Sequence, residues 1–214
     1  MAVLTYRPQI FDAPDLKRAR EIIMTPEPDI STDERWERET PYMTAIAQAH
    51  LMPGPGDTVV DYGCGIGRLS KTLIERSGCN VLGVDISASM RAMAIDYVGS
   101  PNFQALSPEA IAEAVAGGLR VDGAMAIWVI QHVLDPRIVV DLLATSLKPE
   151  ATLFVVNTLT RCVPTVEKFW ARDSYDVRAL LKGRLKETSI GTLDPKWAGR
   201  PAAEYAFWAL YRTT

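Results

Sequence analysis

Short segments rich in valine and leucine alternate with segments of helical periodicity between residues 58 and 156. Each apolar segment has the length of a strand, and the segments between them are long enough to cross over as helices. Strands that are apolar along their whole length are typical of a parallel sheet covered by helices on both faces. The alternation therefore predicts an α/β fold built on a parallel sheet.

This pattern predicts five strands and four helices. The strands are expected at residues 58–62, 81–84, 102–105, 121–127 and 152–156, and the helices at 66–76, 88–97, 108–116 and 136–147. Ser87, Ser107 and Asp135 precede three of the helices, where a short polar side chain accepts a hydrogen bond from a free N–H group of the first turn.

The N-terminal part of the chain departs from the alternation. A short helix is predicted at 14–24, followed by the breaker-rich residues 25–28. Ser31 and Glu34 have the spacing of a capping box, which predicts a helix from residue 32 to residue 51. Because proline lacks the backbone donor, Pro41 predicts a kink in this segment or two separate helices.

The C-terminal part departs from it too. A helix is expected at 174–182, followed by strands at 185–192 and 204–211 that a loop at 193–199 connects. A loop of that length suits an antiparallel pair. We divide the chain into a helical arm or cap, residues 1–52, and a main domain, residues 53–214, within one structural unit.

The composition suits one globular domain. Of the 214 residues, 48% are hydrophobic and 23% are charged, which excludes a disordered chain. A net charge of −3 disfavours a general nucleic-acid binder. Three cysteines without CxxC or Cys/His spacing predict free thiols and no metal site. No apolar run approaches the roughly 20 residues of a membrane span and no secretory signal stands at the start, so we expect a cytoplasmic protein.

The stretch with the clearest chemistry is Val-Val-Asp-Tyr-Gly-Cys-Gly-Ile-Gly-Arg at residues 59–68. Glycines at 63, 65 and 67 join a strand to a helix, where they permit positive φ and let the backbone approach a ligand closely. A tight turn without a ligand is the alternative. The dinucleotide fingerprint needs a glycine at position 68, which is Arg68, so a nicotinamide enzyme is disfavoured.

The pattern Asp61-x-Gly-x-Gly-x-Gly67 resembles motif I of the class I S-adenosylmethionine-dependent methyltransferases. In that family the loop passes against the methionine part of the cofactor, and the acid that opens the motif contacts the same end. The resemblance implies a Rossmann-like three-layer α/β/α sandwich. Its seven-stranded, mostly parallel sheet has the order three-two-one-four-five-seven-six, with an antiparallel last strand.

A second element lies 22 residues after the first glycine, where Asp85 ends the next apolar segment. A carboxylate at that point accepts hydrogen bonds from ribose hydroxyls, in nicotinamide enzymes as well as in methyltransferases. A helix-capping aspartate beside Ser87 is the alternative. The resemblance places Ile86 against the adenine.

Residues 121–132 resemble motif IV, a strand whose end borders the methyl-transfer site. After the third predicted strand, many family members have an acid or amide for the adenine amine, whereas this chain has Leu106 and Ser107. The resemblance implies S-adenosylmethionine as cofactor and assigns contacts with it to Asp61, Gly63, Cys64, Gly65, Gly67, Asp85, Ile86, Leu106 and Trp128.

His132 is the candidate catalytic residue. Its imidazole titrates near neutral pH and follows motif IV, where a general base would meet an acceptor that has to lose a proton. A histidine that only packs or caps the following helix is the alternative. We expect methyl transfer to an oxygen or nitrogen atom of a small molecule. A peptide, protein or RNA methyltransferase and a non-catalytic cofactor-binding protein stay open, whereas the signatures of DNA base methylation are missing.

Two features at the ends of the chain bear on the acceptor. Aromatic residues that are candidates for lining its site are Trp36, Tyr42, Trp128, Phe169, Trp170, Tyr175 and Trp197; packing within the cap is the alternative for each. Residues 168–200 hold eight basic and four acidic side chains, which suits a solvated face or an anionic acceptor. The sequence does not indicate the oligomeric state.

Overall fold

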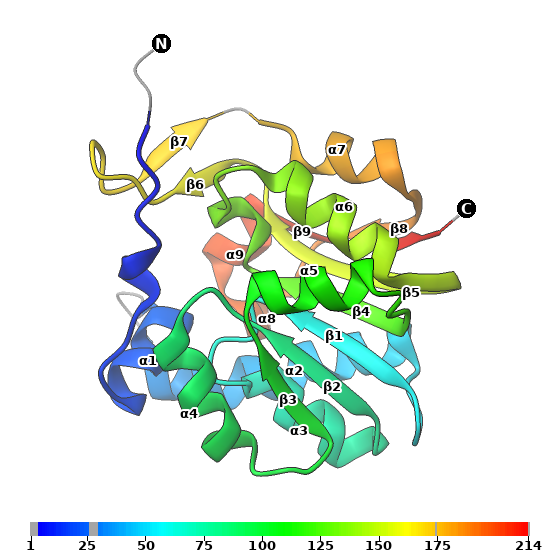
Figure 1. The fold of residues 1–214 in the computed structure, drawn as a ribbon. Helices are drawn as coiled ribbons and strands as arrows, with labels where there is room; N and C mark the ends of the chain where they lie inside the picture. Colours follow the sequence, from blue (N-terminus) through cyan, green and yellow to red (C-terminus); the bar gives the residue numbers. More distant parts are fainter. Residues whose placement is uncertain (1–3, 26–29, 174, 214) are drawn as a thin grey trace.

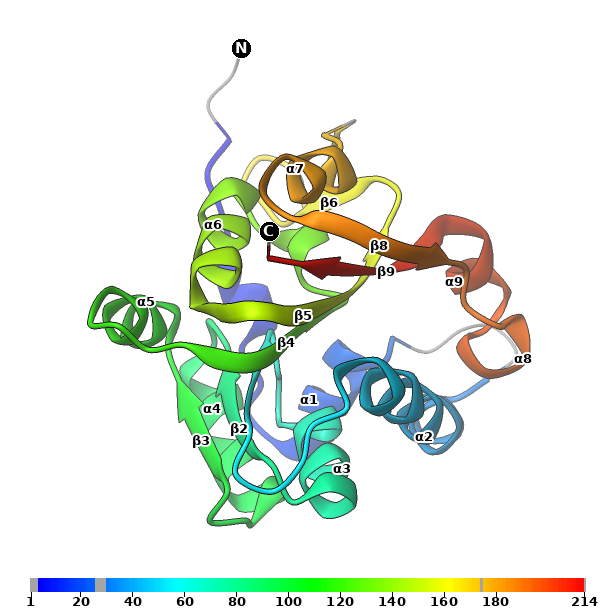
Figure 2. The same ribbon diagram turned by 90° about the vertical axis from the view of Figure 1, so that its right-hand side faces the viewer.

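A computed structural model describes residues 4–25, 30–173 and 175–213. Its centre is a seven-stranded sheet with helices on both faces (Figure 1 and Figure 2). The strand order is β3-β2-β1-β4-β5-β9-β8. Strand β9 pairs antiparallel with both neighbours, and the other six run parallel to one another. The predicted topology, including the antiparallel last strand, is confirmed.

The elements of the sheet and its crossovers agree closely with the sequence patterns. The strands are β1 (Thr58–Tyr62), β2 (Asn80–Val84), β3 (Phe103–Leu106), β4 (Val121–Ile127), β5 (Leu147–Thr158), β8 (Lys186–Gly191) and β9 (Ala206–Arg212). The helices are α3 (Arg68–Ser77), α4 (Ala88–Val98), α5 (Pro108–Ala116), α6 (Pro136–Ser146) and α7 (Val177–Arg184). The predicted caps Ser87, Ser107 and Asp135 each accept a hydrogen bond from the first turn of their helix.

Two apolar cores separate the layers. Helices α5, α6 and α7 contribute Ile111, Val140 and Leu181 to the core on one face of the sheet. On the other face, α3 and α4 pack beside α2 (Thr32–Leu51), which contributes the fully buried Met43. Helix α2 therefore covers the sheet directly. The division at residue 52 stays a prediction.

The N-terminal helices lie on the same side of the molecule as α3 and α4 (Figure 1). A single turn of 3₁₀ helix, η1 (Pro8–Phe11), precedes α1 (Leu16–Ile23). Helix α2 begins with the predicted capping box of Ser31 and Glu34 and runs without a break through Pro41, so the alternative of two separate helices is wrong. Residues 26–28 of the predicted breaker segment and residue 174 lie outside the described residues.

The predicted loop at 193–199 is wrong in part, although the antiparallel pairing of β8 with β9 is confirmed. Helix α8 (Pro195–Ala198) lies within this region, and α9 (Arg200–Tyr205) follows. Helix α9 includes the first two residues of the strand predicted at 204–211, so that strand begins only at residue 206. Asp194 caps α8 and Pro195 starts it, and Gly199 with φ +82° separates the two helices. Asp194-Pro195 is the same helix start signal as Asp135-Pro136, so the start of α8 could have been predicted from the sequence.

The chain between β5 and α7 forms a small hairpin that the sequence pattern did not predict. Strand β6 (Arg161–Val163) pairs with β7 (Ala171–Asp173). The N-terminal arm joins its loop: Tyr6 forms an antiparallel bridge with Thr165, and the Arg7 N–H donates to the Pro164 carbonyl over 3.0 Å. Residues far apart in sequence thus lie side by side at one edge of the molecule (Figure 1).

Within the described residues, no helix has both the length and the apolar character to cross a bilayer.

Arg161 connects this hairpin to the loop between β4 and α6. Its side chain is 8% exposed; Nη1 donates to the carbonyls of Val133 and Leu134, and Nε and Nη2 donate to the Asp173 carboxylate. Replacing it removes four hydrogen bonds that a buried guanidinium donates.

We expect Arg161→Met to lower the free energy of unfolding by about 1–3 kcal/mol, because its carbonyl and carboxylate partners lose their donors. Urea denaturation checks this. The matched control is Arg172→Met on the same hairpin, where the side chain is exposed and the expected change is within about 0.5 kcal/mol. Equal stability of the two variants would contradict the assignment of Arg161 as the anchor.

Candidate active site

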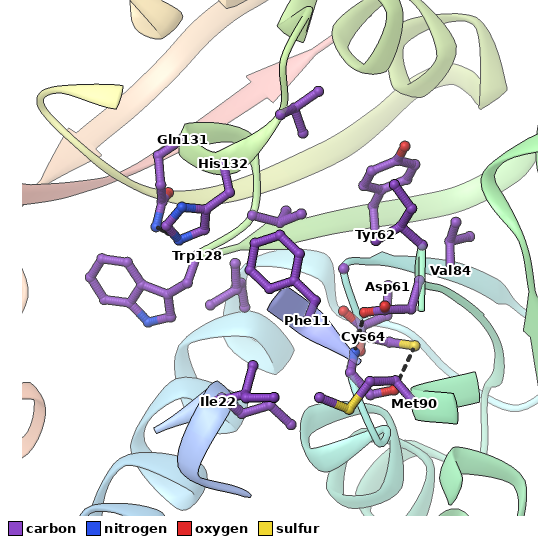
Figure 3. Close-up of a pocket in the computed structure, with 18 of the residues that line it drawn as sticks. Phe11, Ile22, Asp61, Tyr62, Cys64, Val84, Met90, Trp128, Gln131 and His132 are labelled. Atoms are coloured by element: carbon purple, nitrogen blue, oxygen red, sulfur yellow. Dashed lines mark hydrogen bonds between the residues drawn. The ribbon is translucent and has the colours of Figure 1, made fainter. Parts of the chain in front are cut away.

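The carboxyl ends of β1, β2 and β4 open into a cavity of about 600 Å³. The strand order reverses between β1 and β4, and ligands of open α/β sheets bind at such a switch point. The N-terminal arm closes the cavity from the other side with Tyr6, Phe11 and Ile22. Figure 3 shows side chains from the strand ends and from the arm converging on this space.

The glycine turn between β1 and α3 forms one wall. Gly63, Gly65 and Gly67 have φ of +80°, +56° and +77°, which disfavours any residue with a Cβ atom. A Cβ at these positions would lie 2.5 Å from Val129, 2.7 Å from Ile23 and 2.4 Å from Val98, respectively. Gly63 and Gly65 line the cavity, whereas Gly67 caps α3 and faces α4.

Asp85 follows β2 and lies against this turn. One carboxylate oxygen accepts the Gly65 N–H over 2.9 Å and the other accepts the Ser87 N–H over 2.9 Å. Burial raises the pKa of Asp85 above its usual range. The cap of α4 is Ser87 itself, and Asp85 and Ile86 line the cavity. The structure thus brings both predicted contacts to the same space as the glycines.

Asp61, at the start of the motif, is 3% exposed and also lines the cavity. The Ser70 hydroxyl donates to its carboxylate over 2.6 Å. Burial raises the pKa of Asp61 to about 6, and the Ser70 hydrogen bond and the Arg68 charge oppose this only in part. A cationic group placed beside Asp61 would restore its ordinary ionisation.

Beneath the turn lies a buried charged cluster that sequence reasoning missed. Arg68 is 4% exposed, its Nη2 lies 3.4 Å from a Glu39 carboxylate oxygen, and its Nη1 donates to the Thr40 hydroxyl over 3.1 Å. Arg35 pairs with the other oxygen of Glu39 at 3.2 Å. Within the described chain, Arg68 Nε has no hydrogen-bond partner. The i,i+4 spacing of Arg35 and Glu39 in the predicted helix was the available signal.

His132 ends η2 (Ile130–His132), the short 3₁₀ turn after β4. Its Nδ1 lies 2.7 Å from the Cys162 carbonyl oxygen, which only accepts, so Nδ1 carries the proton and Nε2 keeps a lone pair. Burial lowers the pKa of His132 and favours this neutral form. Phe11 and Trp170 pack against the ring, with centroids 5.8 Å and 5.3 Å from it.

Trp128 connects β4 to this turn and lines the cavity. Its φ of +60° is a strained, left-handed conformation for a residue with a side chain. Strain of this kind persists where surrounding contacts fix it, often in binding sites. Here the Trp128 N–H donates to the Val156 carbonyl over 2.9 Å.

Not every predicted contact reaches the cavity. Gly67 and Leu106 are absent from its described lining, and Ser107 is occupied as the cap of α5. Cys64 lines the cavity, but burial raises the pKa of its thiol well above the ordinary value, which argues against a nucleophile. No described basic residue between 168 and 200 lines the cavity. Among described residues, no three His, Cys, Asp or Glu side chains are placed to hold a metal ion.

The sequence matches a family described as "Methyltransferase domain" over residues 33–199, which is most of the chain. The chain belongs to this family. The resemblance to class I S-adenosylmethionine-dependent methyltransferases is thereby confirmed, and so is the Rossmann-like fold.

Curated relatives match part of this methyltransferase domain. The "Ubiquinone biosynthesis O-methyltransferase" of Cupriavidus pinatubonensis is 34% identical over 110 residues, which is 50% of this chain and 43% of that protein. The protein of the same name from Albidiferax ferrireducens is 36% identical over 117 residues, covering 52% of this chain and 45% of that protein. The chain spans less than half the length of these relatives.

Solved structures share the fold over nearly the whole chain. Magnesium protoporphyrin IX methyltransferase from Synechocystis PCC 6803 has a TM-score of 0.65 and 16% identity, covering 97% of this chain and 98% of that one. Geranyl diphosphate C-methyltransferase from Streptomyces coelicolor A3(2) has a TM-score of 0.64 and 14% identity, covering 100% and 92%. At this identity the likeness concerns the fold alone.

Gly67→Ala tests the packing of the turn in this methyltransferase domain. We expect it to lower the free energy of unfolding by about 2–4 kcal/mol, because a Cβ at positive φ is strained and would displace Val98. Gly54→Ala is the control, since the nearest atom to its Cβ is 3.8 Å away. Urea denaturation compares the two, and equal losses would refute the steric explanation.

Asp61→Asn tests the buried carboxylate. The pKa of Asp61 in the folded protein, about 6, lies above the value of roughly 3.9 expected in the unfolded chain. The folded state therefore binds the proton more tightly, and this group destabilises the protein as the pH rises from 4 through 6. Without ligand, we expect Asp61→Asn to be more stable than wild type at pH 7.5, with the advantage shrinking toward pH 4. An advantage independent of pH in urea titrations would contradict the shift.

Proposed function

We propose that this methyltransferase domain binds S-adenosylmethionine at the glycine turn and transfers its methyl group to an oxygen or nitrogen atom of a small-molecule acceptor. The observation that carries the proposal is the arrangement of Gly63, Gly65 and Asp85 around one cavity. Relatives named as O-methyltransferases of ubiquinone biosynthesis support a small acceptor that is methylated on oxygen. A cytoplasmic location and the absence of a DNA partner stay predictions from the sequence.

The adenosine end of the cofactor fits the end of β2. Each oxygen of Asp85 accepts one hydrogen bond, which leaves lone pairs for the two ribose hydroxyls. Ile86 is 44% exposed where it lines the cavity and offers an apolar surface to adenine. Glu109 also lines the cavity and supplies the acceptor for the adenine amine that Leu106 and Ser107 do not provide.

The methionine end fits the buried charged cluster. The guanidinium groups of Arg35 and Arg68 both pair with the carboxylate of Glu39, so a buried arginine lies at this wall of the cavity. The unsatisfied Arg68 Nε gives a carboxylate ligand a donor. Asp61 is the counterpart for the ammonium and sulfonium charges of the same ligand. We assign Gly67 a supporting role within the turn, because it packs against Val98 outside the cavity.

The bound cofactor supplies a methyl group on a sulfonium centre, which is displaced in line. The chain's own part is to hold the acceptor near that group and to exclude water, and positioning of this kind provides effective molarities of roughly 10⁵–10⁸ M. A substrate that receives the methyl group at an O–H or N–H group has to lose a proton there, and the lone pair on His132 Nε2 accepts this proton. Because its pKa is lowered by burial, His132 keeps this lone pair at lower pH than an exposed histidine.

Calorimetry with S-adenosylhomocysteine tests the cofactor site. We expect Asp85→Ala to weaken binding about 10- to 100-fold, because two hydrogen bonds to a charged acceptor are lost. Asp96→Asn on the exposed face of α4 is the control and should bind as wild type does. Absence of binding by wild type at millimolar concentration would refute the proposal.

The transfer itself is tested by supplying labelled S-adenosylmethionine and a cell extract to the wild-type protein. We expect label in the small-molecule fraction, and His132→Ala should reduce it about 10²- to 10⁴-fold. Label on peptide or RNA would replace the small-molecule acceptor with that class. Binding without any transfer would leave a non-catalytic protein.

A further inference from the structure

Gln131, the residue before His132, is held rigidly at the cavity. Its side chain is 3% exposed and lines the space that Trp128 and His132 also line (Figure 3). Its backbone N–H donates to the Asn157 side chain over 3.0 Å, and Asn157 is fully buried near the end of β5. The sheet therefore fixes the backbone of Gln131 at the edge of the cavity.

In the described part of the chain, only one of the two polar atoms of the Gln131 side-chain amide has a partner. Its Nε2 lies 3.4 Å from His132 Nε2, whereas its Oε1 is shielded from solvent and has no hydrogen-bond partner within the described residues. Since His132 Nδ1–H donates to the Cys162 carbonyl, the Nε2 atom of His132 presents a lone pair, and only the N–H side of the amide can face it. The orientation of the amide, with its oxygen away from the imidazole, follows from this tautomer.

A buried amide oxygen without a donor is destabilising and uncommon in folded proteins. The terminal torsion of a glutamine is soft, so the amide can turn at small cost when a ligand enters, which points its oxygen at a donor of the ligand and frees the lone pair of His132 Nε2. The surroundings are apolar and aromatic: Phe11 and Trp128 line the cavity, and Trp170 packs on His132. A ligand that satisfies this oxygen therefore has a flat or apolar body and an O–H or N–H group.

We infer that Gln131 is a specificity-determining residue. Its Oε1 accepts a hydrogen bond from an O–H or N–H group of the substrate that receives the methyl group. This bond orients a largely apolar substrate so that the O–H or N–H group points toward His132. This inference rests on the proposed function, because the space beside His132 is the acceptor site only if the cofactor occupies the glycine turn. An acceptor of the same shape without a donor would leave the oxygen unsatisfied and bind more weakly.

Phenol and anisole are suitable probes, because anisole lacks the O–H donor and keeps the aromatic body. Their dissociation constants are measured by ligand-detected NMR on protein saturated with S-adenosylhomocysteine. We expect wild type to prefer phenol about three- to tenfold, which corresponds to one neutral hydrogen bond. Binding of neither probe, or of both equally, overturns the inference.

Two variants assign the preference to Gln131. Gln131→Leu should lose the preference for phenol, and it should be at least as stable as wild type in urea because the unsatisfied amide is removed. Gln131→Glu keeps a hydrogen-bond acceptor oxygen and should retain the preference for phenol. A preference that survives in Gln131→Leu places the donor elsewhere and overturns the inference. Affinity for S-adenosylhomocysteine is measured first in each protein, so failure of the proposed cofactor site is a separate result from failure of this assignment.

Discussion

The attachment of the glycine turn to the end of β2 is the constraint on which the site depends. The N–H groups of Gly63 and Cys64 both donate to the Val84 carbonyl, over 2.7 Å and 3.0 Å, and Gly65 N–H donates to the Asp85 carboxylate. These bonds draw the turn flat against the neighbouring strand, which requires positive φ and leaves no room for Cβ atoms. The cavity is the space that this compact turn leaves above the sheet.

Charged side chains and neutral aromatic side chains lie on different sides of the cavity. Two carboxylates with raised pKa values, Asp61 in β1 and Asp85 directly after β2, lie beside the turn, and the arginines around Glu39 line the same cavity. Neutral His132 stands on the far side among aromatic rings. The cavity therefore has a charged half next to the turn and an apolar half next to η2. Such a division suits a zwitterionic cofactor and a less polar acceptor.

Much of the fold and part of the site follow from local sequence signals. Strands β1 and β4 and helix α5 have the predicted bounds, because uniform apolar runs and the cap at Ser107 act over a few residues. Of the predicted contacts, Asp61, Gly63, Gly65, Asp85 and Trp128 line one cavity, since the strand ends of a parallel sheet meet at one edge.

The parts that escaped prediction depend on contacts between distant residues. Strands β6 and β7 have three residues each, too few for a periodic pattern, and they are stabilised by the arm and by Arg161. The lining by Arg35 and Glu39 depends on how α2 packs on the turn. The unsatisfied oxygen of Gln131 depends on the tautomer of a neighbouring ring, which no spacing reveals.

The bridge between Tyr6 and Thr165 has a consequence for how the protein folds. These residues are about three quarters of the chain apart, and we expect contacts of such separation to form late because the loop they close is entropically costly. We therefore expect the hairpin and the N-terminal arm, which closes the cavity, to come together after the sheet has formed. The same reasoning makes them the part of the molecule that opens at the smallest cost to the core.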